Sequence, residues 1–87
     1  MQVARSTRFK KNYRKLAAPI RARADRTILL FCNNPFEPIL NNHPLHGEYR
    51  DRRSLDVTGD FRIVYREIVP GIALLINIGT HHELYGS

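Results

Sequence analysis

The sequence of 87 residues has no tryptophan, a single cysteine and no long hydrophobic run. Cys32 has no second cysteine with which to close a disulfide within the chain, which is typical of a protein from a reducing compartment. No apolar run approaches the roughly 18 to 20 residues that span a bilayer, so a membrane-spanning helix is excluded. The basic start leads into no apolar segment, so we expect no secretory signal either. We therefore expect a cytoplasmic protein with no membrane partner.

Acidic residues are scarce in the first third of the chain. Residues 1–26 hold nine Lys or Arg and one acid, Asp25, so this segment carries +8 while the other 61 residues sum to −2. Concentrated positive charge attracts a polyanion or an acidic protein, although a solvated helix surface accounts equally well for such a stretch. The candidate residues for such a contact are Arg8, Lys10, Lys11, Arg14 and Lys15.

The length allows one domain, residues 1–87, and the first half of the chain has helical periodicity. We expect an edge strand over 2–6, then a helix capped by Ser6 or Thr7. A second helix, with Pro19 in its first turn, should run to Asn33. The prolines that follow indicate an ordered loop over 33–47, which holds two of the four histidines.

From residue 53 onward the apolar pattern has a period of two, which predicts strands. Residues 54–57 and 60–69 should pair through a two-residue turn at 58–59, and residues 72–78 should form an inner strand after a turn at 70–71. Residues 81–87 are expected to be a short tail. The predicted fold is α+β, with two N-terminal helices on one face of a mainly antiparallel twisted sheet of about four strands. The other face should be open.

Arginines are predicted on that open face. Alternation places Arg62 and Arg66 opposite the apolar set of Phe61, Ile63 and Tyr65. A guanidinium can bind a phosphate through two hydrogen bonds and stabilise the charge that develops in phosphoryl transfer. The alternative is an ordinary cross-strand ion pair with an acid, for which Asp56 and Glu67 are the candidates.

Histidine is the side chain that both accepts and donates protons near neutral pH. The chain has four, His43, His46, His81 and His82, and Tyr85 adds a phenolic donor. RNA cleavage needs a base that deprotonates the 2′-hydroxyl, a cation that stabilises the phosphorane charge and an acid that protonates the leaving oxygen. A histidine, an arginine and a second histidine or a tyrosine can fill these three roles in turn, without a metal. For any single histidine, however, a structural hydrogen bond or plain surface placement is the default interpretation.

The sequence offers little support for a cofactor. His43 and His46 lie three apart in a proline-bearing loop, without the helical spacing of zinc proteases, and Cys32 has no CxxC partner. There is no glycine-rich phosphate loop, nucleophile elbow or dinucleotide fingerprint. We therefore expect neither a metal site nor a small-molecule cofactor.

Three sequence blocks together resemble one known family. HPLHG at 43–47, DVTGDFRIVYRE at 56–67 and IGTHHELYG at 78–86 are similar, in order and spacing, to the YafQ-like messenger-RNA interferases of the RelE/ParE toxin superfamily. The resemblance covers nearly the whole chain and implies the RelE-like microbial ribonuclease fold. It also implies the toxin of a bacterial type II toxin-antitoxin module, an endoribonuclease that cuts messenger RNA in the ribosomal A site. Its implied partners are messenger RNA, ribosomal RNA and a cognate antitoxin with an acidic segment. The candidate residues for contact with RNA or the ribosome are Arg8, Lys10, Lys11, Arg14, Lys15 and Arg66.

The resemblance also implies which residues are catalytic. Matched position by position, these are His43, Asp60, Arg62, His81 and Tyr85, and possible auxiliary residues are His46, Asp56, Phe61 and His82. Well-known YafQ-like sequences have a histidine where this chain has Asp56, so proton transfer at that position must be altered, shared or lost. We expect Asp56 either to orient Arg62 or His81, or to be a solvated surface acid.

Two other functions remain open at this point. The ParE branch shares the fold and inhibits DNA gyrase, and a catalytically silent RNA-binding partner would fit the departure at Asp56. ParE-type proteins are not expected to carry the constellation of His43, Asp60 and His81, which therefore favours the ribonuclease over gyrase inhibition; the silent partner stays open because of Asp56.

Overall fold

A computed structural model describes residues 1–86 of the protein and contains three helices and five strands among them. The helices are α1 (Thr7–Arg14), α2 (Ala18–Asn33) and α3 (His81–Tyr85). The strands are β1 (Gln2–Arg5), β2 (His43–Pro44), β3 (Arg53–Asp56), β4 (Phe61–Val69) and β5 (Ile72–Thr80). Short 3-10 turns lie at Pro38–Leu40 and Gly47–Tyr49. Within this part of the chain no helix is both long and apolar enough to cross a bilayer.

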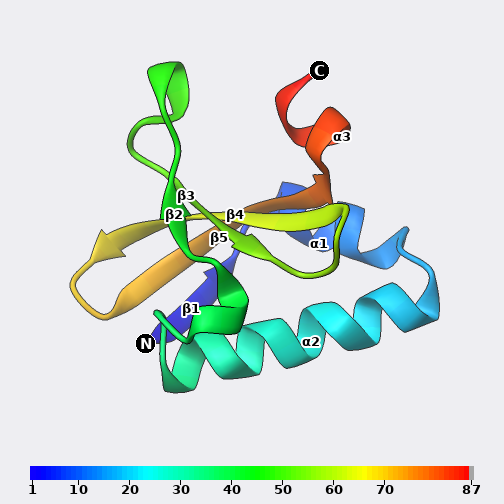
Figure 1. The fold of residues 1–87 in the computed structure, drawn as a ribbon, viewed down its shortest axis with the longest axis horizontal. Coiled ribbons are helices and arrows are strands. Elements are labelled where there is room, and N and C mark those ends of the chain that lie inside the picture. Colours follow the sequence, from blue (N-terminus) through cyan, green and yellow to red (C-terminus); the bar gives the residue numbers. More distant parts are fainter. Residues whose placement is uncertain (87) are drawn as a thin grey trace.

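The strands form one sheet in the order β1-β5-β4-β3-β2 (Figure 1). β1 runs parallel to β5 and every other neighbouring pair is antiparallel, so the predicted architecture and the position of β1 at an edge are confirmed. The strand beyond the predicted four is β2, in which His43 pairs with Ser54 and Pro44 with Arg53. A strand of two residues, one of them proline, has no alternation by which a sequence could reveal it.

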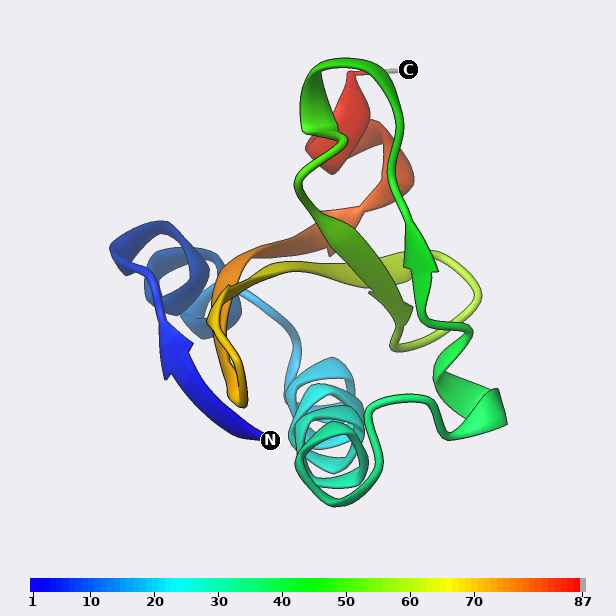
Figure 2. The ribbon, with the colours of Figure 1, turned by 90° about the vertical axis from the view of Figure 1, so that its left-hand side faces the viewer.

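Both long helices contribute to one core on one face of the sheet. Phe9 of α1 and Phe31 of α2 are fully buried, and the Phe31 ring meets the ring of Tyr65 on β4 with centroids 4.7 Å apart. Figure 2 shows α2 beneath the sheet. Burying an aromatic or aliphatic side chain of this size stabilises the fold by about 1.5–3 kcal/mol. Because Ile63 and Tyr65 face this core, Arg62 faces the opposite side, as the alternation predicts.

The loop between α2 and β2 is ordered by a polar network around Asn42. Its amide nitrogen donates to the Pro35 carbonyl and to the Tyr65 hydroxyl, each at 2.8 Å. Its amide oxygen accepts a hydrogen bond from Nε of Arg53 at 2.7 Å. This network ties the loop to β3 and β4, and so fixes where His43 begins β2.

Two local predictions are wrong. The β3–β4 connection is not a two-residue turn at 58–59, because residues 57–60 all lie between the strands. The Thr58 hydroxyl stabilises this wider turn by accepting hydrogen bonds from the amides of Asp60 at 3.2 Å and Phe61 at 3.0 Å. The expected tail at 81–87 is instead helix α3 from His81 to Tyr85, while Ser87 lies outside the described residues.

Candidate active site on the open face

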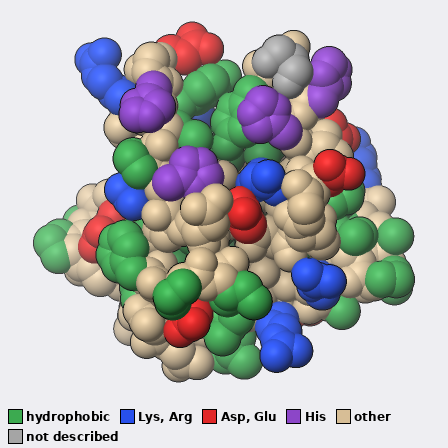
Figure 3. All heavy atoms as spheres, in the orientation of Figure 1, with side chains coloured by type: hydrophobic (Ala, Val, Ile, Leu, Met, Phe, Trp, Pro, Cys, Tyr) green, Lys and Arg blue, Asp and Glu red, His purple; other side chains and the backbone are tan. Residues whose placement is uncertain are grey.

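The open face of the sheet has two projecting elements. Residues 45–52, which join β2 to β3 and are called the arm here, stand on the side of the sheet opposite α2, and α3 stands on the same side (Figures 1 and 2). The rings of Tyr49 on the arm and Tyr85 on α3 meet edge to face with centroids 6.1 Å apart. Histidine side chains gather around these two elements (Figure 3). The site is therefore framed by the arm, the middle of the sheet and α3.

Arg62 is held at the centre of this face by Asp56. The two residues are register partners on β4 and β3, and the Arg62 Nε lies 3.0 Å from Asp56 Oδ1. Both side chains are half-buried, so this pair is better shielded from water than a surface ion pair. The cross-strand ion pair that the sequence left as an alternative is therefore present, and it fixes the direction of the guanidinium.

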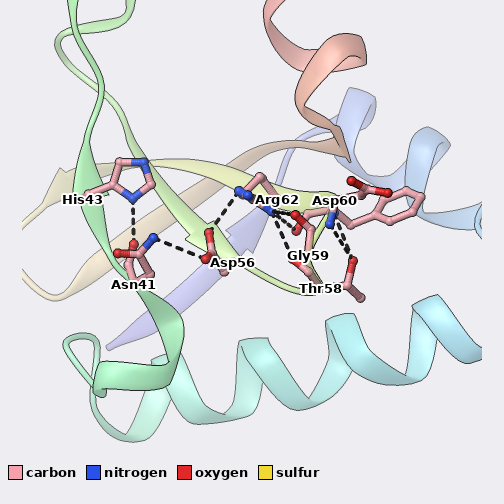
Figure 4. Close-up of polar contacts among 8 residues, drawn as sticks. Asn41, His43, Asp56, Thr58, Gly59, Asp60 and Arg62 are labelled. Atoms are coloured by element: carbon pink, nitrogen blue, oxygen red, sulfur yellow. Dashed lines mark hydrogen bonds and ion pairs between the residues drawn. The ribbon is translucent and has the colours of Figure 1, made fainter.

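The β3–β4 turn provides a second hold on Arg62. Its Nη1 donates to the carbonyl oxygens of Thr58 at 3.0 Å and Gly59 at 2.9 Å, with a longer contact to that of Phe61 (Figure 4). The four-residue turn makes this possible, because it brings its carbonyl groups toward the guanidinium. One Nη group makes none of these contacts, which leaves hydrogen-bond donors for an anion.

His43 joins the same network through Asn41. Nδ2 of Asn41 donates to Asp56 Oδ2 at 3.2 Å, and His43 Nδ1 lies 2.7 Å from the Asn41 carbonyl oxygen (Figure 4). A carbonyl oxygen only accepts, so Nδ1 carries the proton and Nε2 of the neutral ring is left as an acceptor. Asn41 has φ of 46°, and asparagine tolerates this left-handed conformation better than most residues.

A second group is formed by α3 and the arm. The rings of His81 and Tyr85 meet edge to face at 4.8 Å, and the guanidinium of Arg52 lies 5.3 Å from the centre of the Tyr49 ring. The two groups lie on neighbouring strands, because Arg62 is opposite Gly79 on β5 and His81 begins α3 two residues later. The structure thus places His43 and Arg62 in one network and His81 and Tyr85 in an adjacent one.

A capping box starts α3 and so sets the position of His81. The Thr80 hydroxyl accepts a hydrogen bond from the Glu83 amide at 3.2 Å, and the Glu83 carboxylate accepts one from the Thr80 amide at 2.8 Å. The same carboxylate would lie 3.2 Å from a Cβ at Gly79, so this glycine allows the close approach. The sequence Thr80-x-x-Glu83 is the signal by which α3 could have been predicted.

Acid is expected to loosen α3. The backbone hydrogen bond from Thr80, followed by that of its side chain, holds the pKa of the Glu83 carboxyl below its usual range. Because the pKa of Glu83 is lower in the folded than in the unfolded chain, the cap contributes its full stability above the unfolded pKa of about 4.3. This stability is lost as the pH falls through the folded pKa. The Thr80 amide proton should therefore shift in an acid titration followed by NMR. Glu83→Gln is the control, since its cap does not titrate, and an unresponsive wild-type amide would contradict the assignment.

The basic side chains of α1 are all exposed. They are Arg8, Lys10, Lys11 and Arg14, together with Lys15 at the C-cap, and none of them forms an ion pair with an acid within residues 1–86. The one acid of this region, Asp25, instead accepts a hydrogen bond from the Tyr13 hydroxyl at 2.7 Å, which raises the pKa of Tyr13. The charge of α1 therefore remains available to an anionic partner. Arg8 differs from the rest because it also lines a cavity on the open face.

The remaining predicted residues lie around this centre. Asp60 is exposed in the β3–β4 turn, and its carboxylate makes no ion pair or side-chain hydrogen bond with the rest of residues 1–86. Arg66 is exposed on β4, 3.6 Å from Asp51. Phe61 packs against the core, while His46 on the arm and His82 on α3 are exposed.

Sequence reasoning missed three residues that organise the site. Asn41 bridges His43 and Asp56, Tyr49 connects the arm to α3, and Arg52 lies over the Tyr49 ring within the arm. The only sequence signal at the arm is the presence of three arginines among residues 50–53. In residues 1–86 there is no group of three or more His, Cys, Asp or Glu side chains placed to hold a metal ion.

Comparison with known proteins identifies the family. The family model "Bacterial toxin of type II toxin-antitoxin system, YafQ" matches residues 1–86. No curated protein sequence matches the chain.

Solved structures share the fold. YafQ from E. coli strain BL21(DE3) is 22% identical over 98% of both chains with a TM-score of 0.80. A chain of the E. coli DinJ-YafQ complex is 20% identical over 98% of both, with a TM-score of 0.70. In the RelBE2 toxin-antitoxin complex from Mycobacterium tuberculosis the match is 18% identical, covers 92% of this chain and 96% of that chain, and has a TM-score of 0.77. At these identities the structures establish the fold alone. Because the family model spans nearly its whole length, the chain belongs to the YafQ family of bacterial toxins of type II toxin-antitoxin systems.

Proposed function

We propose that this toxin is a ribosome-dependent endoribonuclease that cleaves translated messenger RNA and so stops translation. The observation that carries the proposal is the fixed guanidinium of Arg62 on the open face, between the elements that bear His43 and His81. An arginine whose direction is set in advance stabilises developing phosphoryl charge without reorganising. Histidines on either side supply a base and an acid.

The chemistry needs only side chains of this chain. His43 Nε2 takes the proton of the 2′-hydroxyl, and the resulting oxygen attacks the neighbouring phosphorus. Arg62 stabilises the negative charge of the phosphorane. The bond from phosphorus to the 5′-oxygen breaks as that oxygen takes a proton from His81. The products are a 2′,3′-cyclic phosphate and a 5′-hydroxyl, formed without a metal.

Tyr85 and Asp60 have supporting roles in this proposal. The ring of Tyr85 packs edge to face with that of His81, and so restricts the orientation of the imidazole. Asp60 is in the turn that holds Arg62, where an exposed carboxylate can meet the RNA or the ribosome.

The partners follow from family and charge. A type II toxin has a cognate antitoxin, and the unpaired basic side chains of α1 favour an acidic antitoxin segment in the inactive complex. The same side chains, together with Arg66, would contact ribosomal RNA in the active state. Toxin-antitoxin complexes among the structural relatives support the first of these partners.

Induced expression in bacteria is expected to cut messages only while they are translated. The matched control is a reporter message that differs by one disabled start codon and should remain intact. Mapping new 5′ ends on both reporters gives the cleavage sites. If both reporters remained intact while DNA gyrase was inhibited, the ParE-like function would replace this one. RNA that is bound but never cut would indicate a silent RNA-binding protein.

A further inference from the structure

A small cavity lies where α1, the arm and α3 meet on the open face. Arg8 of α1, Arg52 of the arm and Tyr85 of α3 line it, with Asn77 of β5. Its volume is about 70 Å³, which is room for a few water molecules or one phosphate-sized group. Arg62 is not among its lining residues, so the cavity is separate from the site at which Arg62 would meet the scissile phosphate.

The cavity is positively charged. Two guanidinium groups line it and no aspartate or glutamate does. The acid nearest in sequence, Asp51, forms a half-exposed ion pair with Arg52, with Oδ1 3.7 Å from Nε, beyond hydrogen-bond distance; this pair offsets only part of the charge of the two guanidinium groups. Two arginines that line one cavity repel each other unless an anion lies between them.

Two lining residues also have hydrogen bonds left unmade. The Tyr85 hydroxyl and Arg52 Nε are both buried, and neither has a hydrogen-bond acceptor within residues 1–86. A buried donor without an acceptor costs free energy, and an incoming oxyanion that supplies the acceptor recovers it. Arg52 Nε can only donate and the Tyr85 hydroxyl can donate, so one group that presents oxygen lone pairs would satisfy both.

We propose that this cavity binds a phosphodiester of the RNA strand next to the one that is cleaved. The inference rests on the proposed function. The bound phosphate would accept hydrogen bonds from Arg8, Arg52 and the Tyr85 hydroxyl after a small movement of the side chains that cover them. The contact of Tyr85 with His81 places this phosphate beside the proposed acid. Arg8 and Arg52 therefore hold the strand in register, while Arg62 serves the reacting phosphate.

The test begins with the free protein and dimethyl phosphate, a phosphodiester without a base or sugar. NMR of the arginine Nε–H groups should show a saturable shift at Arg52 in the wild type. That shift should disappear in Arg8→Gln, which removes one guanidinium of the cavity. Arg50→Gln is the matched control, because it removes the same charge from an exposed position on the arm outside the cavity. Loss of the shift in Arg50→Gln as well would show general charge attraction and overturn the proposal.

A short 2′-O-methyl RNA, which cannot be cleaved by its own 2′-oxygen, then identifies the source of the phosphate. It should displace dimethyl phosphate from Arg52, and Arg52→Gln should weaken its binding about tenfold or more and reduce the salt slope by about 1. Binding of inorganic phosphate without dimethyl phosphate or RNA would make this a free-anion site and overturn the assignment. Weaker antitoxin binding in Arg52→Gln with unchanged RNA binding would overturn it in favour of a protein carboxylate. A protein that binds the diester but cuts no message would refute the proposed function alone.

Discussion

Replacing His81 with alanine is expected to lower the rate of message cleavage by about 10²–10⁴-fold, the usual loss when a proton-transfer group is removed. His81 is exposed in the first turn of α3, so the substitution removes no buried contact from the core. The free energy of unfolding should therefore remain close to that of the wild type. Cleavage is best measured in a purified translation system, where the amount of folded toxin is known.

The control for this variant is chemical rescue. Added imidazole should restore part of the activity of His81→Ala, because it can carry the proton to the leaving oxygen. Circular dichroism should show that the variant remains folded. Full cleavage by the folded variant without imidazole would remove His81 from the mechanism and leave the acid to be found elsewhere on the open face.

Replacing Arg62 with alanine is expected to cost about 10²–10³-fold in cleavage, as removal of one preorganised donor to a developing anion does elsewhere. Arg62→Lys should recover little of this loss. A single ammonium group cannot contact Asp56 and the carbonyls of Thr58 and Gly59 together while leaving donors for a phosphate. The single-turnover cleavage rate of bound RNA is the measurement, since it separates chemistry from binding.

Variants of Asp56 test whether this residue orients Arg62. If Asp56 orients the guanidinium, Asp56→Asn should lower the cleavage rate less than Arg62→Ala does, and a double variant should show that the two losses are not additive. Asp56→His would likewise reduce cleavage by removing the ion pair. A gain with histidine would mean instead that a proton-transfer position is vacant here. No change in either variant would place Asp56 outside the active site.

The sheet could be predicted because one face is buried. Phe61, Ile63 and Tyr65 alternate with Arg62, and this alternation alone places the arginine on the open face. The two-residue turn was predicted wrongly because Thr58 and Gly59 fit a tight hairpin in composition, whereas the Thr58 hydroxyl stabilises a longer connection. Turn length depends on which amides a side chain can reach in three dimensions.

The parts of the site that could not be predicted depend on contacts between distant segments. Asn41 has an ordinary loop sequence, and only the fold shows that it bridges His43 and Asp56. The pairing of Tyr49 with Tyr85 joins residues 36 positions apart, which no local sequence pattern relates. The capping box of α3 is the exception, since Thr80 and Glu83 are near neighbours and the pattern is readable from sequence.

The parallel pairing of β1 with β5 joins the first strand to the last, and this has a consequence for when the toxin becomes active. Gln2 is the register partner of Ile72, and β5 lies between β1 and β4 in the sheet. The sheet therefore cannot be completed until β5 has been synthesised and has left the ribosome. Helix α3, which bears His81, is synthesised later still. If the protein acts as we propose, it is harmless to the ribosome that is making it.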